Sequence, residues 1–129
     1  MARRKSRTFT EVELEFMQIL WSAGEATPDD IQNALAGTGR TLTGGSIRNI
    51  LAILVEKGYI TRRKKGKTHL YKPRVHEEQA KKSFVQDILA RVFDGSESLM
   101  VAALLKNREI DRKEIDEIER LINERKKEN

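Results

Sequence analysis

The chain contains no cysteine and only two prolines, and aromatic residues make up 5% of it. Without cysteine there is no disulfide, thiolate metal ligand or cysteine nucleophile. No run approaches the roughly 18 consecutive apolar residues that predict a membrane-spanning helix. The basic start, MARRKSRTFTE, is not followed by an apolar stretch, so we expect no secretory signal there. These absences favour a reducing, cytoplasmic location.

Catalytic and metal-binding signals are also missing. The two histidines, His69 and His76, have no metal-ligand spacing around them. No glycine-rich phosphate loop lies between a strand and a helix. The acidic residues near the C-terminus are typical of a solvated helix face with i,i+4 ion pairs. We therefore predict that the chain is not an enzyme and has no metal or other cofactor.

Positive charge is concentrated in the first part of the chain. Residues 1–75 carry 14 Lys and Arg against 7 Asp and Glu, whereas residues 76–129 carry 11 against 13. From Lys57 to His76 there are eight basic residues and no acidic one. This distribution predicts a polyanion-binding N-terminal part. At 38% hydrophobic residues the chain can build only a small core, which favours burial against a partner subunit.

Two helices are predicted near the N-terminus. Thr10 and Glu13 form a T-x-x-E capping box at the start of the first, and Gly24 ends it. Thr27 is a suitable N-cap for the second, with Pro28 in its first turn. A glycine-rich loop over residues 36–45 follows.

A third helix begins near Thr43 and ends at Lys57 and Gly58. Its large apolar residues fall on one face: Ile47, Ile50, Leu51, Leu54 and Val55. The face opposite these residues has short side chains near the start of the helix, so it can approach another molecule closely.

Residues 59–63 and 68–72 are typical of two short strands joined by a turn over residues 64–67. Three helices followed by such a hairpin predict a winged helix-turn-helix, which we assign to residues 8–75. This domain is a small α+β unit with a two-stranded wing.

The rest of the chain predicts helices only, over residues 77–93, after Ser96, and after Asp111. The middle helix is apolar nearly all round, so we expect it to be buried. Three such helices cannot seal a core alone, and we assign residues 76–127 to an all-α dimerisation domain of a two-fold homodimer. The fold is thus mainly α. The apolar residues expected at the dimer contact are Phe84, Ile88, Val92, Leu99, Val101, Leu104, Leu105, Ile115, Ile118, Leu121 and Ile122.

Three segments together resemble one known family. FTEVELEFMQILW (9–21), SIRNILAILVEKGYITRRKKGKTHLYKP (46–73) and SLMVAALL (98–105) are similar to the penicillinase repressor, or BlaI/MecI, family of transcriptional regulators. The resemblance extends over about residues 8–122. It implies a winged-helix N-terminal domain, an all-α dimerisation domain, and repression by a dimer on a two-fold symmetric DNA operator.

The chain departs from the family pattern in several places. Penicillin-responsive members are cut by a membrane sensor-protease at an Asn-Phe bond, and the matching positions here are Ala102 and Ala103. The resemblance therefore does not imply induction by that cleavage. The copper-responsive branch carries a C-terminal cysteine cluster, which is absent. The usual S-P-K-T opening of the recognition helix is replaced by residues 43–46, T-G-G-S, and Ile53 replaces a commonly polar or basic residue. We expect a different operator sequence.

The third helix is expected to enter the major groove with its N-terminal half. Thr43, Ser46 and Asn49 can hydrogen-bond bases or phosphates, and Asn suits adenine. Ile53 can pack on a thymine methyl group, whereas Arg48 is placed toward phosphate.

Backbone and charge complete the expected DNA contacts. Gly45, with its neighbour Gly44, allows close approach of the backbone to a phosphate. A basic N-terminal arm carries Arg3, Arg4, Lys5 and Arg7. The wing supplies cations for phosphates or the minor groove: Arg62, Arg63, Lys64, Lys65 and Lys67.

The sequence thus predicts a homodimeric, sequence-specific repressor that binds a two-fold symmetric operator through residues 43–57 and the basic wing. An alternative stays open: a winged helix that binds RNA or a protein without operator specificity. The expected recognition face lacks the stacking aromatic residues usual in readers of single-stranded RNA.

Overall fold

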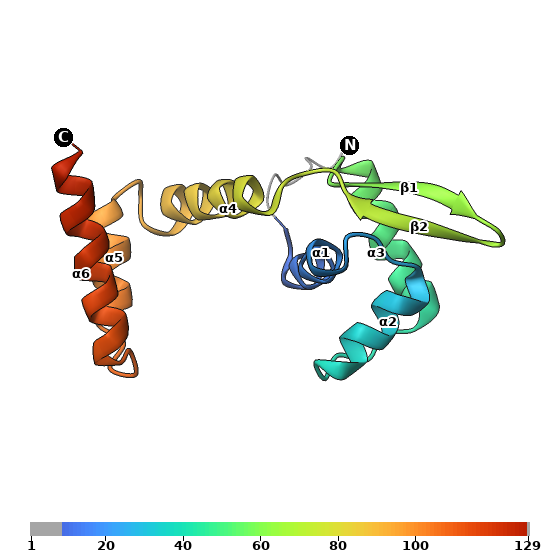
Figure 1. The fold of residues 1–129 in the computed structure, drawn as a ribbon, viewed down its shortest axis with the longest axis horizontal. Coiled ribbons are helices and arrows are strands. Elements are labelled where there is room, and N and C mark those ends of the chain that lie inside the picture. The colour runs from blue at the N-terminus through green and yellow to red at the C-terminus, as the bar shows by residue number, and fades with distance from the viewer. Residues whose placement is uncertain (1–8, 129) are drawn as a thin grey trace. The chain divides into compact units, whose positions relative to one another are not determined.

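The computed structural model describes residues 9–128. Residue contacts divide the chain into two compact units, with the division between residues 87 and 88, inside the fourth helix. The domain boundary placed at residues 75 and 76 from the sequence stays a prediction. The elements, shown in Figure 1, are α1 (Glu11–Ala23), α2 (Pro28–Gly37), α3 (Gly44–Glu56), β1 (Ile60–Lys65), β2 (Thr68–Pro73), α4 (Glu77–Val92), α5 (Glu97–Leu105) and α6 (Arg112–Lys127).

The helix starts expected in the first unit are confirmed. The Thr10 hydroxyl accepts from the Glu13 backbone N–H at 3.1 Å, and the Glu13 carboxylate accepts from the Thr10 N–H at 2.8 Å. Thr27 caps α2 as expected, and Asp30 completes a second reciprocal capping box. Gly24 ends α1 with a φ of +85°, a conformation that side chains other than glycine rarely adopt.

Helices α2 and α3 form the helix-turn-helix (Figure 1). The connection between them is residues 38–43, shorter than the expected loop, because α2 continues to Gly37 and α3 begins at Gly44. The side-chain amide of Gln32 donates to the Leu42 carbonyl at 2.9 Å and so fastens the connection to α2. Thr43 is the N-cap of α3, as predicted.

The hairpin is longer than the sequence suggests. Its antiparallel pairing runs from Ile60 opposite Pro73 to Lys65 opposite Thr68, which leaves only residues 66 and 67 in the turn. Gly66 has a φ of +60°, as a two-residue hairpin turn with glycine first requires. The expected first strand ended two residues too early because Lys is depleted in strands, and here the cross-strand pairing outweighs that preference.

A third segment joins the hairpin. The backbone N–H and carbonyl of Ala26 each bond to Tyr71 of β2, both at 2.9 Å. Ala26 therefore pairs with the edge of β2 that faces away from β1. This bridge attaches the base of the wing to the segment between α1 and α2.

One hydrophobic core unites these elements. Trp21 is half-buried at the edge of this core. Its ring meets the ring of Phe9 edge to face, with centroids 6.2 Å apart, and its indole N–H donates to the Val75 carbonyl at 3.1 Å. The buried side chains of the core are Phe9, Phe16, Met17, Leu20, Ala26, Ile31, Leu35, Ile47, Leu51, Leu54, Ile60 and Tyr71. The predicted mainly α, winged-helix fold is confirmed.

The C-terminal helices have no buried residue. Ser96 caps α5 and Asp111 caps α6, as predicted. The expectation that α5 would be buried is wrong for the single chain, since four of its large apolar side chains are exposed: Leu99, Val101, Leu104 and Leu105. The described helices around α5 are too few to enclose a helix that is apolar on all sides. Within residues 9–128 no helix combines the length and apolarity needed to cross a membrane.

Candidate nucleic-acid interface

The exposed side of α3 is the side that the sequence assigns to DNA. Ile47, Leu51 and Leu54 are fully buried, which turns the opposite side of the helix toward solvent. Ile53 is 37% exposed, so this side also offers a large apolar contact. All six residues predicted to contact DNA from this segment are exposed: Thr43, Gly45, Ser46, Arg48, Asn49 and Ile53.

The N-terminus of α3 is organised by two hydroxyl groups. The Thr43 hydroxyl accepts from the Ser46 backbone N–H at 3.1 Å and donates to the Ser46 hydroxyl at 3.0 Å. Thr43 therefore already uses its donor within the protein. The Ser46 hydroxyl hydrogen stays available for an acceptor on a ligand.

Arg48 folds back toward the start of the helix. A Cβ atom placed on Gly44 would lie 3.5 Å from Nη1 of Arg48. The guanidinium group thus lies beside the backbone at the positive end of α3. A helix N-terminus and an adjacent cation both favour an anion such as phosphate.

The basic wing residues fall into two sets because neighbouring strand residues point to opposite faces. On one face, the Arg63 guanidinium is 3.2 Å from the Glu25 carboxylate. On the same face, hydrogen bonds with Thr27 lower the pKa of Asp30, and the charge of Lys65 lowers it further. Arg63 is therefore partly neutralised by Glu25, whereas Lys65 acts on Asp30 only through its charge and forms no ion pair within residues 9–128.

The other wing cations are not neutralised in this way. Arg62 and Lys64 on the second face, and Lys67 in the turn, are exposed, and none has an acidic partner within residues 9–128. They are the wing charges that stay fully available to a polyanion. The arm residues Arg3, Arg4, Lys5 and Arg7 lie outside the described residues.

The structure also reveals partners that the sequence did not indicate. Glu25 and Asp30 are 38 and 35 positions away from their wing cations, so no local spacing connects them. A buried ion pair between Glu13 and Lys57 spans 44 positions. The T-x-x-D pattern at residues 27–30 is the one local signal that would have identified a part of this arrangement, the reciprocal cap of α2.

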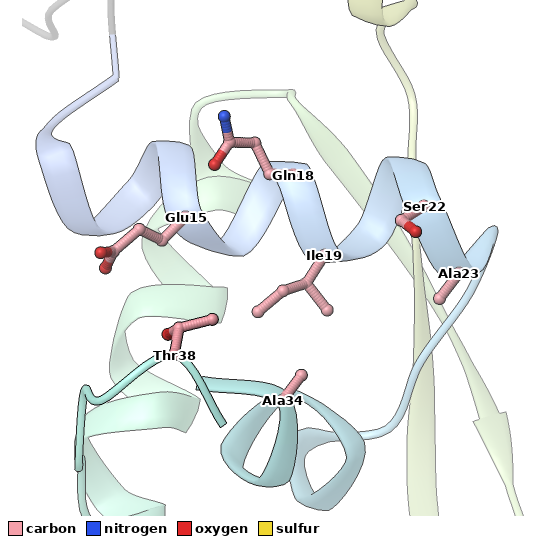
Figure 2. Close-up of a pocket in the computed structure, with 7 residues that line it drawn as sticks. All are labelled: Glu15, Gln18, Ile19, Ser22, Ala23, Ala34 and Thr38. Atoms are coloured by element: carbon pink, nitrogen blue, oxygen red, sulfur yellow. The ribbon is translucent and has the colours of Figure 1, made fainter. Parts of the chain in front are cut away.

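A shallow groove of about 400 Å³ lies between α1 and α2 (Figure 2). Ile19 points from α1 toward Ala34 of α2, and Glu15 lies near the end that carries Thr38. Its lining is mainly apolar and includes no residue of α3 or the hairpin. The groove therefore lies apart from the residues predicted to contact DNA.

Within residues 9–128 no three His, Cys, Asp or Glu side chains are grouped to hold a metal ion.

The sequence model of the penicillinase repressor family matches residues 9–124. The chain belongs to the penicillinase repressor family. Members of this family are DNA-binding transcriptional repressors rather than enzymes.

Individual relatives align over nearly the whole chain. The penicillinase repressor of Bacillus licheniformis is 27% identical over 123 residues, which cover 95% of each chain. The methicillin resistance regulatory protein MecI of Staphylococcus aureus strain Mu50 is 24% identical over 121 residues, 94% of this chain and 98% of the relative. The solution structure of the DNA binding domain of the repressor BlaI matches with 25% identity and a TM-score of 0.50, covering 58% of this chain and 90% of that one.

The apolar residues predicted at the dimer contact differ in how far they are exposed in the single chain. Of the residues predicted at the dimer contact, Phe84, Ile88 and Ile118 are half-buried within the chain. Ala102 is half-buried and Ala103 is exposed, both within α5; the resemblance led us to expect these positions to match the bond that is cut in penicillin-responsive members. The remaining predicted dimer residues are exposed: Val92, Leu99, Val101, Leu104, Leu105, Ile115, Leu121 and Ile122.

Proposed function

We propose that this member of the penicillinase repressor family is a homodimeric, sequence-specific transcriptional repressor that binds a two-fold symmetric DNA operator. The observation that carries the proposal is the exposed side of α3, in the same compact unit as a hairpin whose Arg62, Lys64 and Lys67 have no acidic partner among residues 9–128. Such a helix fits the major groove, and such a tip fits phosphates. We also propose that the protein is cytoplasmic.

Each part of the interface has its own role. Ser46 and Asn49 hydrogen-bond base edges, and Ile53 packs on a thymine methyl group. Thr43 caps the helix and contacts the backbone, while Gly45 lets the sugar-phosphate approach. The cations bind phosphates: Arg48 at the helix start, Arg62, Lys64, Lys65 and Lys67 directly, and Arg63 once it leaves Glu25.

Dimerisation is assigned to residues 76–127 and DNA binding to residues 8–75. The support for a second copy is the exposed apolar surface of α5 and α6, which one chain leaves uncovered. A two-fold dimer presents two copies of α3 to two half-sites, which makes the operator palindromic. A partner of this kind also explains why a helix as apolar as α5 occurs in the chain.

The test is binding to a site selected from random duplexes, measured against salt concentration. About four phosphate contacts per half-site predict a log–log slope of about −7 for the dimer. Duplex RNA and single strands serve as competitors. An affinity for the selected duplex equal to that for random DNA would refute the proposal, and preference for RNA would favour the alternative winged-helix module.

Two variants separate affinity from sequence choice. Asn49→Ala should relax preference at one or two base pairs, by about 1–3 kcal/mol for a good bidentate contact. Lys64→Ala with Lys65→Ala should instead weaken binding to all duplexes and make the salt slope shallower. The opposite pattern would mean that the roles of the helix and the wing are reversed.

A further inference from the structure

Three acidic side chains occupy the first half of α1, at Glu11, Glu13 and Glu15. Glu13 is the one charged residue classed as buried among residues 9–128. Both of its carboxylate oxygens accept hydrogen bonds from the Lys57 ammonium group, at 3.0 and 2.9 Å, while Oε1 also accepts from the Thr10 backbone. The two side chains are only 6% and 13% exposed, so the pair is largely removed from water.

The other two acids contact the opposite end of the recognition segment. Arg40, in the connection before α3, forms an ion pair with Glu15, and its Nη2 atom is 3.6 Å from Glu11. Lys57 follows α3 directly as its C-cap. The acids of α1 therefore bind one cation before α3 and one cation after it.

These contacts restrain α3 in a way that its apolar contacts do not. The buried face of α3 is made of aliphatic side chains, Ile47, Leu51 and Leu54, whose attraction is not directional. The Glu13–Lys57 pair is hydrogen-bonded and so has a required geometry, whereas the Arg40–Glu15 ion pair has no hydrogen bond and restrains α3 less. Its net contribution to stability is small because removing two charges from water offsets their attraction. Its distinctive contribution is therefore orientation.

We propose that Glu13 and Lys57, with Glu15 and Arg40 as a weaker second point, position α3 for sequence reading. The pairs fix the rotation and depth at which α3 presents Ser46, Asn49 and Ile53 to base edges. They are positioning residues, since none of the four is assigned to the DNA contact. The inference rests on the proposed DNA-binding function.

The decisive variant is E13Q/K57M. Glutamine keeps an oxygen for the Thr10 cap, and methionine keeps most of the lysine stem, so the ion pair is removed with little change in volume. The matched control is E77Q/K81M, which removes the exposed pair on α4 by the same substitutions. Both variants keep the net charge, so long-range attraction to DNA is unchanged.

Affinities for the selected operator and for a random duplex are measured at one salt concentration, with thermal unfolding of each variant. We expect the ratio of the two affinities to fall about tenfold in E13Q/K57M, the effect of weakening one bidentate base contact. Affinity for random DNA should stay within a factor of about two, because phosphate contacts tolerate small displacements. E77Q/K81M should match the wild type in both measurements.

A purely structural role would lower both affinities together, in proportion to the unfolded fraction, and would overturn the proposal. A folded E13Q/K57M variant with the wild-type ratio would also overturn it. Should that variant fail to fold, Glu15→Gln decides: its half-exposed pair leaves the fold intact, and an unchanged ratio there refutes the positioning role. A wild-type chain without any duplex preference would instead refute the proposed function itself.

Discussion

Residues 9–87 and residues 88–128 use apolar side chains in opposite ways. The first region encloses a core of twelve buried side chains from three helices, both strands and the segments beside them. The second buries no residue, and eight large apolar side chains in it are exposed. Both regions are nonetheless built from capped helices with clear start signals.

The difference shows which region can be stable alone. Removing apolar surface from water is the main stabilising contribution to a fold, and residues 9–87 obtain it within one chain. In the proposed dimer, residues 88–128 obtain it when a second copy covers α5 and α6. We therefore expect the stability of the first region to be independent of protein concentration and that of the second to depend on it.

The largest effect is expected when the uncovered surface is made polar. Leu104→Asp together with Leu121→Asp, both about half exposed, should make the chain monomeric because charged side chains cannot be buried between copies without partners. Binding to a two-fold operator should weaken by about 10²–10⁴-fold as the two half-sites become independent. Sedimentation equilibrium and titration of whole and half operators measure both effects.

The control for this variant is Val85→Asp. Val85 is also an exposed apolar residue, at 44%; it lies in the first region and within residues 76–127, but it is not among the side chains predicted at the dimer contact. It should leave the chain dimeric. A Leu104→Asp, Leu121→Asp chain that sediments as a dimer would contradict the assignment of this surface.

The next effect compares one leucine from each region. Leu51→Ala, at a fully buried position, should lower the free energy of unfolding by about 2–5 kcal/mol at any protein concentration. Leu121→Ala, half exposed in one chain, should cost more as the concentration rises, because only the dimer buries it. Urea unfolding, followed by circular dichroism at two protein concentrations about 100-fold apart, distinguishes the two variants because mass action changes the stability of a dimer but not of a monomer. Equal concentration dependence in both variants would contradict the comparison.

Local patterns in the sequence were sufficient for the helix starts and for the fold. The capping residues Thr10, Thr27 and Thr43 each satisfy backbone N–H groups within one turn, so their effect is visible in a few consecutive letters. The alternation of buried and exposed positions in α3 likewise follows from its own residues. The exposed side of the helix was therefore predictable.

Contacts between residues that are distant in the sequence could not be predicted from it. Nothing around Ala26 indicates a strand, and its pairing exists only because Tyr71 presents a free edge. The bonds of Glu13 to Lys57 and of Arg63 to Glu25 depend on how three helices and a hairpin pack. The pattern of α5 predicts that it must be covered, but it does not say whether the cover comes from the same chain.

A smaller effect concerns the acids that neutralise part of the wing. Glu25→Gln should free Arg63 for phosphate and steepen the salt slope for random duplex by up to about 0.9, the release of one counterion. The matched control is Glu124→Gln in α6, which adds the same net charge beside Arg120 and far from the wing in sequence. It should leave the slope unchanged. Equal slopes in the two variants would show that net charge alone, not release of Arg63, governs binding.

The smallest effect tests the polar cap of α2 through its pH dependence. Hydrogen bonds with Thr27 lower the pKa of Asp30 below its ordinary value of 3.8, with Lys65 adding to the shift. A carboxyl group whose pKa is lower in the folded state contributes stability above its unfolded pKa, and that stability is lost as pH falls through the folded pKa. Asp30→Ala should therefore lower the melting temperature at neutral pH, and the difference from wild type should begin to shrink near pH 3.8 and close as pH falls through the lower pKa of the folded state. Asp29→Ala, in the same turn, removes an equal charge but no bond to Thr27, so it should cost less at neutral pH. A difference between Asp30→Ala and wild type that persisted unchanged into acid would mean that the aspartate acts by packing rather than by its charge.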